Sequence, residues 1–218
     1  MKDLCIIFHI HDDSDATRYN LNSVRHYLPD NSIVAVVSYH PVPLSELTFP
    51  IVDQNDSGLQ VWHADKIIWE YILHPEKVEA RRYLYLESDT CCKGSIRKFY
   101  EQVWDCHLAV PKVITQQEFP DWWWWLYQRE GLFDELTWGI RPICGVLMSR
   151  QAAISMAAIS RNPKYDRLFS ECRMAVLARV AGFDPVEIPK GAYYLRCCDH
   201  GDPHVEGAIW HPIKTIET

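Results

Sequence analysis

The chain has 218 residues, of which 48% are hydrophobic and 23% are charged, and its formal net charge is −7. These values indicate one globular domain of ordinary composition and exclude long disordered tracts and fibrous repeats. An acidic chain without a block of basic residues is also a poor candidate for general nucleic-acid binding, although a local phosphate pocket is compatible with it.

The sequence favours a cytoplasmic protein. Its apolar runs are far shorter than the roughly 20 residues that a transmembrane helix needs. The apolar stretch 4–10 carries His9 and runs directly into the polar segment 11–15, without a small-residue cleavage site, so we expect no signal peptide. The eight cysteines include no Cys-x-x-Cys motif, and without an export signal we expect reduced thiols.

Strands and helices are predicted to alternate along the first two thirds of the chain. The apolar run 4–10 predicts a buried parallel strand, and the polar cluster 12–15 offers N-caps for a helix over 16–28. A second apolar run, 32–39, completes a β-α-β unit. The fold class that we predict is therefore α/β: a single Rossmann-like domain with a mixed, mostly parallel sheet flanked by helices.

The remaining elements follow from apolar periodicity and from turn residues. We expect helices at 62–73, 95–103, 150–160 and 169–181, and strands at 82–86, 107–113, 138–149, 186–188 and 193–195. Gly182 suits the C-terminal end of the last helix. The proline-containing segment 41–50 and the histidine-rich tail from residue 199 are expected to be loops.

Two carboxylates mark the end of the predicted strand 82–86. Glu87-Ser88-Asp89 follows this apolar strand directly. In open α/β sheets the ligand crevice lies outside the C-terminal ends of the strands. Two acids placed there can bind Mg²⁺ or Mn²⁺, and the cation can in turn hold a diphosphate. The alternative is an ordinary strand-to-loop turn whose acids cap the next helix.

A β-α-β start followed by a strand ending in an acidic triplet resembles the GT-A fold of nucleotide-sugar-dependent glycosyltransferases, and family 2 among them. The glycine-led segment 145–152 is similar to the place in those enzymes where a strand meets the next helix. The segment 170–183 is similar to their helix that opens with a base carboxylate and ends in Arg-x-x-Gly-aromatic. Residues 210–212, Trp-His-Pro, resemble their late metal-binding histidine.

The resemblance implies an activity and roles for particular residues. The activity is divalent-metal-dependent transfer of a sugar from a nucleotide-diphosphate sugar, with a UDP-sugar as the commonest donor, to a carbohydrate or other acceptor hydroxyl. Asp89, Glu87 and His211 become metal ligands, Glu87 a donor-ribose contact as well, and Glu171 the catalytic base, which favours inversion. Glu87 replaces the family's usual first aspartate, and Ser170-Glu171 replaces its common Glu-Asp. Glu171 also has a purely structural interpretation, because a first-turn acid stabilises its helix through the dipole.

The resemblance further divides the chain into a nucleotide-sugar-binding half, 1–113, and an acceptor-side half, 114–218. Six side chains of the first half are candidates for contacts with the donor nucleotide: Asp12, Asp13, Asp15, Arg18, Asp53 and Lys66. Asp53 is a weaker candidate that follows a possible short strand, and the others have simpler interpretations. The residues of the first loop can cap the following helix, and a lysine on a buried helix commonly extends to solvent.

Four consecutive tryptophans, Trp122, Trp123, Trp124 and Trp125, stand out among the nine in the chain. On a helix, four successive side chains cover about 300° of the circumference, so one buried face cannot hide them all. Indole rings pack well on the apolar faces of sugar rings. We interpret the run as an acceptor platform; a helix buried between the sheet and a loop, or a protein–protein patch, is the alternative.

Three other functions compete with sugar transfer. A carbohydrate- or partner-binding module would use the tryptophans and not the carboxylates. A nucleotidyltransferase would usually carry a glycine-rich basic loop after the first strand, whereas here that loop is acidic and lacks glycine. A structural zinc site would draw on the tail, whose candidate ligands are Cys197, Cys198, Asp199, His200, His204 and His211. Adjacent cysteines chelate one tetrahedral ion poorly.

Overall fold

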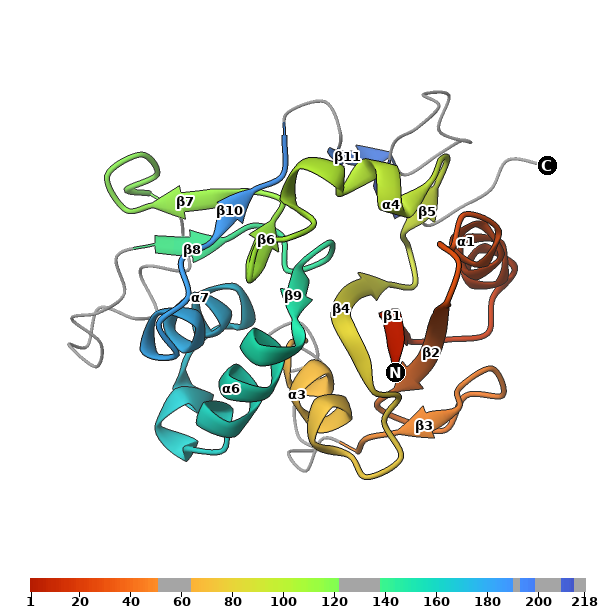
Figure 1. Cartoon of the computed structure of the whole chain (residues 1–218), viewed down its shortest axis with the longest axis horizontal. Helices are drawn as coiled ribbons and strands as arrows, with labels where there is room; N and C mark the ends of the chain where they lie inside the picture. The colour runs from red at the N-terminus through yellow and green to blue at the C-terminus, as the bar shows by residue number, and fades with distance from the viewer. Residues whose placement is uncertain (51–63, 122–137, 190–192, 199–208, 214–218) are drawn as a thin grey trace.

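The computed structural model describes residues 1–50, 64–121, 138–189, 193–198 and 209–213 (Figure 1). A seven-stranded sheet runs through its centre, in the order β10-β6-β9-β4-β1-β2-β3. Its strands are β1 (Lys2–Ile10), β2 (Ser32–Ser38), β3 (Leu47–Thr48), β4 (Ala80–Glu87), β6 (Leu108–Val110), β9 (Leu147–Ser149) and β10 (Val186–Glu187). The two-residue edge strand β3 lies in the segment for which we predicted a loop.

The sheet is mixed and mostly parallel. β1 is parallel to both β2 and β4, and the pairs β2–β3 and β10–β6 are parallel as well. β9 is antiparallel to its two neighbours, β4 and β6. The predicted fold class is therefore confirmed: an α/β, Rossmann-like sheet with helices on its faces.

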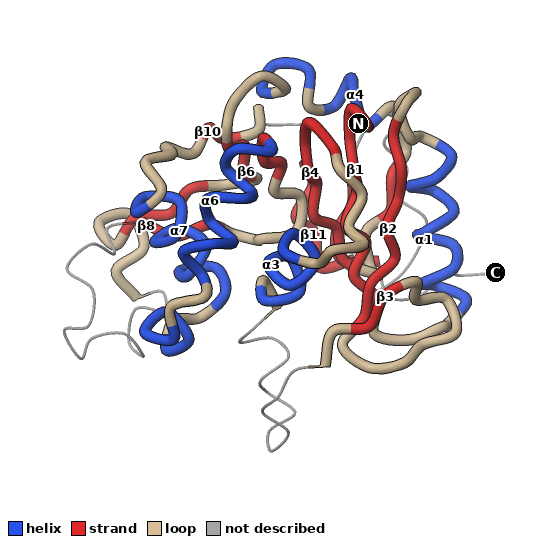
Figure 2. The backbone as a smooth tube through the Cα atoms, turned by 60° about the horizontal axis from the view of Figure 1, so that its bottom comes forward, coloured by secondary structure: helices blue, strands red, loops and turns tan. Residues whose placement is uncertain are grey.

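Helices cover both faces of the sheet, as Figure 2 shows. On one face lie α3 (Lys66–Leu73), α6 (Arg150–Ser160) and α7 (Ser170–Val180), and on the other lie α1 (Asp15–His26) and α4 (Ile96–Phe99). Successive side chains of a strand point to opposite faces, so Cys5 and Ile7 of β1 join the core beneath α3, whereas Leu4 and Ile6 join the core beneath α1. Both faces of β1 are therefore buried, as its continuous apolar run predicts.

Local signals set several helix ends. The Ser14 hydroxyl accepts the Thr17 N–H at 3.2 Å and caps α1. At the end of α7, Gly182 has φ +79°, a left-handed conformation that glycine adopts without strain. The N–H groups of Gly182 and Phe183 bond to the carbonyls of Arg179 and Ala178, which is a Schellman motif. The predicted role of Gly182 is confirmed. Within the described residues, no helix is long and apolar enough to cross a membrane.

Two predicted strands turned out to be wrong in extent. The stretch 138–149 contains β8 (Trp138–Ile140) and β9, which belong to different sheets, and 107–113 is divided between β6 and β7 (Val113–Thr115). β7 and β8 form a two-stranded antiparallel sheet. The turn before β9, where Gly145 has φ +91°, separates the two strands. The predicted helix 95–103 is likewise divided into α4 and the 3-10 turn η1 (Glu101–Val103).

The C-terminal part of the predicted loop is a strand. β12 (Ile209–Ile213) lies between β11 (Tyr193–Cys198) and β5 (Cys91–Cys92) in a three-stranded sheet. The expectation of a loop from residue 199 onward is therefore wrong for 209–213. The adjacent residues His211 and Pro212 interrupt the apolar residues of this segment and hide its strand character. Its pairing with β5 is a long-range contact that no local pattern reveals. A second 3-10 helix, η2 (Pro163–Arg167), precedes α7.

Candidate functional site at the carboxyl end of β4

The strand order reverses between β1 and β4, because the chain places β2 on one side of β1 and β4 on the other. Ligands of open α/β sheets bind outside the carboxyl ends of the strands at such a reversal. His9, near the end of β1, lies opposite Glu87 at the end of β4. The loops 11–14 and 88–90 that follow these strands therefore meet at one edge of the sheet.

A tight turn presents the two predicted carboxylates. The N–H of Thr90 donates to the carbonyl of Glu87 at 2.9 Å. From α1, the side-chain amide of Asn20 donates to the Ser88 carbonyl at 2.9 Å. Glu87 and Asp89 thus lie two residues apart on a turn that is anchored by helix α1. Both side chains are partly buried.

Strand pairing brings His211 to this turn. Ile209 of β12 lies opposite Cys92 of β5, so the chain continues past the start of β5 towards Asp89. Nε2 of His211 is 2.8 Å from a carboxylate oxygen of Glu87 and 3.0 Å from one of Asp89. The structure thus brings together the three residues that the sequence analysis selected as metal ligands.

Cys144 is a fourth member that the sequence analysis did not select. Its Sγ, a carboxylate oxygen of Glu87 and a ring nitrogen of His211 all lie within 4.8 Å of one another. The hydroxyl of Thr90 is 3.1 Å from this Sγ. Cys144 is buried, and it directly precedes the turn that leads into β9. In the sequence, the glycine that follows Cys144 indicates a turn, but it does not predict that the turn lies next to Glu87.

Glu171 lies close enough to this cluster for the charges to interact. It occupies the first turn of α7 and is mostly buried. The pKa of its carboxyl is raised to about 8, mainly because the group is buried. The positive charges of Arg141 and His211 partly oppose this rise, and the negative charge of Glu87 adds to it. A carboxyl that titrates near neutral pH is suited to proton transfer. The charges of two predicted metal ligands, Glu87 and His211, therefore act on the carboxyl of the predicted base.

His211 is held as a cation in this setting. Burial by itself lowers the pKa of the imidazole, but Cys144, Asp89 and Glu87 together raise it well above its usual range. Nδ1 of His211 is buried and has no hydrogen-bond partner within the part of the chain that the structure describes. A positive charge between two carboxylates is the arrangement that a divalent cation would replace. The donor set of carboxylate oxygen and imidazole nitrogen fits such an ion.

A buried hydrogen-bond chain supports Glu87 from below, and the sequence analysis did not detect it. The Tyr85 hydroxyl is 2.9 Å from Nδ1 of His9 and donates to Glu87 at 3.3 Å. The His9 ring makes edge contacts with His11 and Tyr39. Burial, followed by the nearby His11 and His40, holds the pKa of His9 well below its usual value. The neutral His9 and the Tyr85 hydroxyl thus support the side chain of Glu87 from within the sheet.

The first loop uses its polar groups locally. The Thr17 hydroxyl and the Ser14 N–H donate to Oδ1 of Asp12 at 2.7 and 3.0 Å, and the Thr17 bond is the main cause of the lowered pKa of Asp12. Arg18 pairs with Asp13 at 2.5 Å, not with a site residue. Asp15 is exposed in the first turn of α1.

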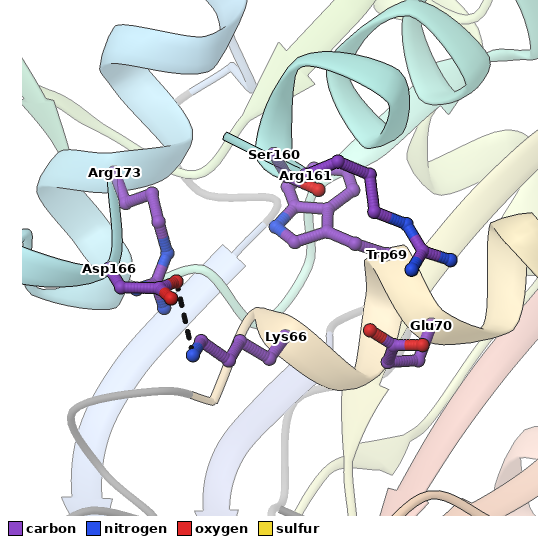
Figure 3. A pocket seen from close by; sticks show the side chains of 7 residues that line it. All are labelled: Lys66, Trp69, Glu70, Ser160, Arg161, Asp166 and Arg173. Carbon is purple, nitrogen blue, oxygen red and sulfur yellow. Dashed lines mark ion pairs between the residues drawn. The ribbon is translucent and has the colours of Figure 1, made fainter. Parts of the chain in front are cut away.

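Lys66, the predicted diphosphate contact, lines a pocket next to Asp166. Its ammonium group pairs with Asp166 at 3.0 Å (Figure 3). This pocket, of about 170 Å³, lies between α3 and the residues that connect α6 to α7. It is lined by Lys66, Trp69, Glu70, Ser160, Arg161, Asp166 and Arg173.

Several predicted residues lie outside the described part of the chain. These are Asp53, Trp122, Trp123, Trp124, Trp125, Asp199, His200 and His204. Cys197 and Cys198 belong to β11.

No protein-family model matches the chain, and no curated protein matches it. Among solved structures, it is similar to the glycosyltransferase GlyE of Streptococcus pneumoniae TIGR4, with 11% identity, a TM-score of 0.41, and coverage of 86% of this chain and 45% of that one. The apo structure of the bifunctional glycosyltransferase WbbM has 10% identity and a TM-score of 0.40, with 81% and 37% covered. Mouse xyloside xylosyltransferase 1 has 13% identity and a TM-score of 0.38, with 83% and 77% covered.

The chain therefore spans less than half the length of GlyE and of WbbM. At these identities and TM-scores the similarities define neither a substrate nor a reaction for this chain. Its function has to be argued from its own site.

Proposed function

We propose that the protein is a glycosyltransferase that moves a sugar from a nucleotide-diphosphate sugar to an acceptor hydroxyl. The observation that best supports this is the meeting of Glu87 and His211, which are 124 positions apart in sequence, at 2.8 Å beside Asp89. These are the residues to which the resemblance to GT-A enzymes assigns the metal. Glu171, selected in the same way, lies within electrostatic range of the same cluster.

Glu87, Asp89 and His211 are the residues that would hold a divalent cation, Mn²⁺ or Mg²⁺ in the family pattern. Such a cation offsets the negative charge that grows on the diphosphate as the sugar leaves. The three side chains converge from two segments of the chain, and the turn beneath them is fixed by Thr90 and Asn20. Glu87, Asp89 and His211 therefore form a preformed cradle for the cation, which in turn would offset the negative charge of the diphosphate.

The loop after β1 supports binding of the donor nucleotide, for which UDP-sugars are the first to test. It lies beside the carboxylate turn, since β1 and β4 are adjacent and parallel. One carboxylate oxygen of Asp13 is buried and has no hydrogen-bond partner among the residues that the structure describes. A ribose hydroxyl or a base N–H is the kind of donor that this oxygen lacks. Asp53, Lys66 and the tryptophan run 122–125 stay candidates for donor and acceptor contacts.

Glu171 is the group that we assign to the acceptor proton. An attacking hydroxyl must lose its proton, and a base is most effective when its pKa lies near the working pH. The raised pKa of Glu171, about 8, meets this requirement. Direct attack assisted by such a base inverts the anomeric centre, so the product of an inverting reaction has the opposite anomeric configuration from the donor. Proton NMR of the anomeric signal during turnover distinguishes the two courses.

The first experiment measures the thermal stability of the protein with a panel of nucleoside diphosphates and nucleotide sugars, with and without Mn²⁺. A ligand at about 100 times its dissociation constant adds about 2.7 kcal/mol to the stability of a protein to which it binds only in the folded state. We expect stabilisation by one nucleotide, and only in the presence of the cation. Asp89→Asn should abolish that stabilisation. Asp30→Asn, at an exposed position before β2, is the matched control and should retain it.

The second experiment separates binding from chemistry. Glu171→Gln removes the proton acceptor but keeps the shape of the side chain, so donor stabilisation should persist while transfer falls by about 10²- to 10⁴-fold. Transfer at a rate close to that of the wild type would place the base elsewhere. Absence of any nucleotide effect in the wild-type protein would refute the transferase assignment and favour a binding module.

A further inference from the structure

The cation site contains a sulfur donor that the acidic triplet does not predict. Sγ of Cys144, a carboxylate oxygen of Glu87 and a ring nitrogen of His211 lie within 4.8 Å of one another. Donor atoms around one tetrahedral ion, at metal–ligand distances of 2.0 to 2.3 Å, are about 3.5 Å apart. Small side-chain movements would therefore bring all three atoms into one coordination shell.

The backbone of Cys144 is held against the site. The N–H of Gly145, the next residue, donates to the Tyr85 carbonyl at 2.8 Å. The carbonyl of Gly145 accepts a hydrogen bond from the Tyr100 hydroxyl at 2.9 Å. Val146 also accepts the Tyr85 N–H at 3.0 Å. Tyr85 lies two residues before Glu87 on β4. Hydrogen bonds to β4 therefore fix the position of Cys144 relative to Glu87, which belongs to the same strand.

A hydroxyl lies beside the sulfur. The Thr90 side chain, buried at the end of the carboxylate turn, is 3.1 Å from Sγ of Cys144. Metal-bound thiolates and carboxylates are commonly oriented by such hydrogen bonds from neighbouring groups. The same turn therefore provides a carboxylate ligand and a hydrogen bond that can orient the sulfur.

We propose that Cys144 is a metal ligand together with Glu87 and His211, and that the site prefers a borderline ion such as Zn²⁺ or Co²⁺ to Mg²⁺. Thiolate and imidazole ligands select zinc and related ions, whereas Mg²⁺ takes oxygen ligands almost exclusively. The inference rests on the cation site of the proposed function and specifies its metal. The alternative is that Cys144 only fills space as a small apolar side chain, as buried cysteines commonly do.

Cobalt spectroscopy tests this directly on the 218-residue chain. Co²⁺ is added to the metal-free wild-type chain, and we expect visible d–d bands together with a near-ultraviolet sulfur-to-cobalt charge-transfer band. Cys144→Ser should lose the charge-transfer band. Cys5→Ser is the matched control, because Cys5 is also buried but bonds to the Tyr71 hydroxyl at 3.3 Å, away from the cluster; it should retain the band.

Metal competition gives a second measurement. In chelator titrations the wild-type protein should bind Zn²⁺ more tightly than Mg²⁺, and Cys144→Ser should weaken Zn²⁺ binding by roughly 100-fold. The wild-type cobalt spectrum reports only that a cysteine binds the ion, so the comparison of Cys144→Ser with Cys5→Ser is what assigns the band to Cys144. Bound Co²⁺ without a charge-transfer band in the wild-type protein overturns the inference.

The outcomes also separate this inference from the proposed function. Cation-dependent nucleotide binding with no cobalt–sulfur band leaves the transferase proposal standing and removes Cys144 from the metal site. A cobalt–sulfur band that both Cys144→Ser and His211→Ala abolish, in a protein that binds none of the nucleotides tested, establishes the site of Cys144, Glu87 and His211 and removes the transferase. Failure of wild-type protein to bind any of these ions refutes both.

Discussion

The buried pair Asp65–Arg173 and the cluster around His211 both keep ionisable groups away from water, but they differ in how completely those groups are satisfied. Asp65 accepts hydrogen bonds from two nitrogens of Arg173 and from the Trp69 indole. Another Arg173 nitrogen donates to the Leu168 carbonyl at 3.1 Å. One positive and one negative charge thus offset each other within a closed set of bonds.

The cluster at the end of β4 is not closed in this way. The carboxylates of Glu87 and Asp89 flank one imidazole whose other nitrogen has no partner among the described residues, and the charges of Glu87 and His211 act on the carboxyl of Glu171. Buried charges that are fully paired are common in structural roles, whereas strongly shifted titratable groups concentrate at functional sites. The unbalanced cluster at the end of β4, and not the fully bonded pair Asp65–Arg173, is therefore the part of the molecule that we expect to bind a ligand.

The largest effect is expected from breaking the balanced pair. Arg173→Met leaves the Asp65 carboxylate buried without its counter-ion, which should cost about 3–5 kcal/mol of unfolding free energy. The double variant Asp65→Asn/Arg173→Met removes both charges and should recover part of that loss. Urea denaturation measures all three proteins. A single variant that loses less than about 1 kcal/mol would show that the pair is not the structural element that we describe.

The next effect is a pH dependence at the unbalanced cluster. The pKa of Glu171 rises from 4.5 to about 8 on folding, mainly through burial. The folded chain therefore holds this proton more tightly than the unfolded chain, so its stabilising contribution is complete below pH 4.5 and is lost as the pH rises to about 8. At about 1.4 kcal/mol per unit, this amounts to roughly 2–4 kcal/mol once partial exposure is considered.

Glu171→Gln should remove that loss, so the variant gains stability over the wild type as the pH rises through this range. Urea denaturation in a chelator, at several pH values, measures the effect without a bound cation. Glu101→Gln, at an exposed position, is the control and should follow the wild-type curve. A wild-type curve that does not fall towards pH 8 relative to Glu171→Gln would contradict the assignment.

A smaller loss of unfolding free energy is expected when the hydrogen bonds that support the cluster from the core are removed. Tyr85→Phe removes the hydroxyl that bonds both His9 and Glu87, and leaves a buried imidazole nitrogen without its partner. An unsatisfied buried polar group costs about 1–3 kcal/mol. Thermal or urea unfolding measures this cost. If the Tyr85 hydroxyl orients Glu87, the affinity for the cation should fall as well. If both stability and cation affinity are unchanged, the hydrogen bonds of Tyr85 do not support the site.

The smallest effect is expected at the exposed pair. Lys66 and Asp166 are about a third and a half exposed, respectively, and such pairs contribute about 0–1 kcal/mol. Lys66→Ala should therefore leave the unfolding free energy almost unchanged. Nucleotide binding by this variant is the informative measurement, because a large loss of affinity at constant stability would establish Lys66 as a donor contact.

Much of the fold was predictable from local patterns. The apolar runs of β1 and β2, the cap at Ser14 and the left-handed Gly182 are signals that act over a few residues. The acidic turn was predictable for the same reason, because it follows directly from the end of a buried strand. The division of 138–149 between two sheets was not, since the choice of partner strand depends on residues far away in the chain.

The sequence by itself determined which side chains can carry chemistry: two carboxylates after β4, a glutamate opening α7 and a late histidine. Tertiary structure alone decided that they meet, because the pairing of β12 with β5 sets the position of His211. It also decided that Cys144 joins them, through the backbone bonds that hold Gly145 to Tyr85. Local propensity acts over a few neighbouring residues, whereas a site of this kind is assembled by long-range strand pairing.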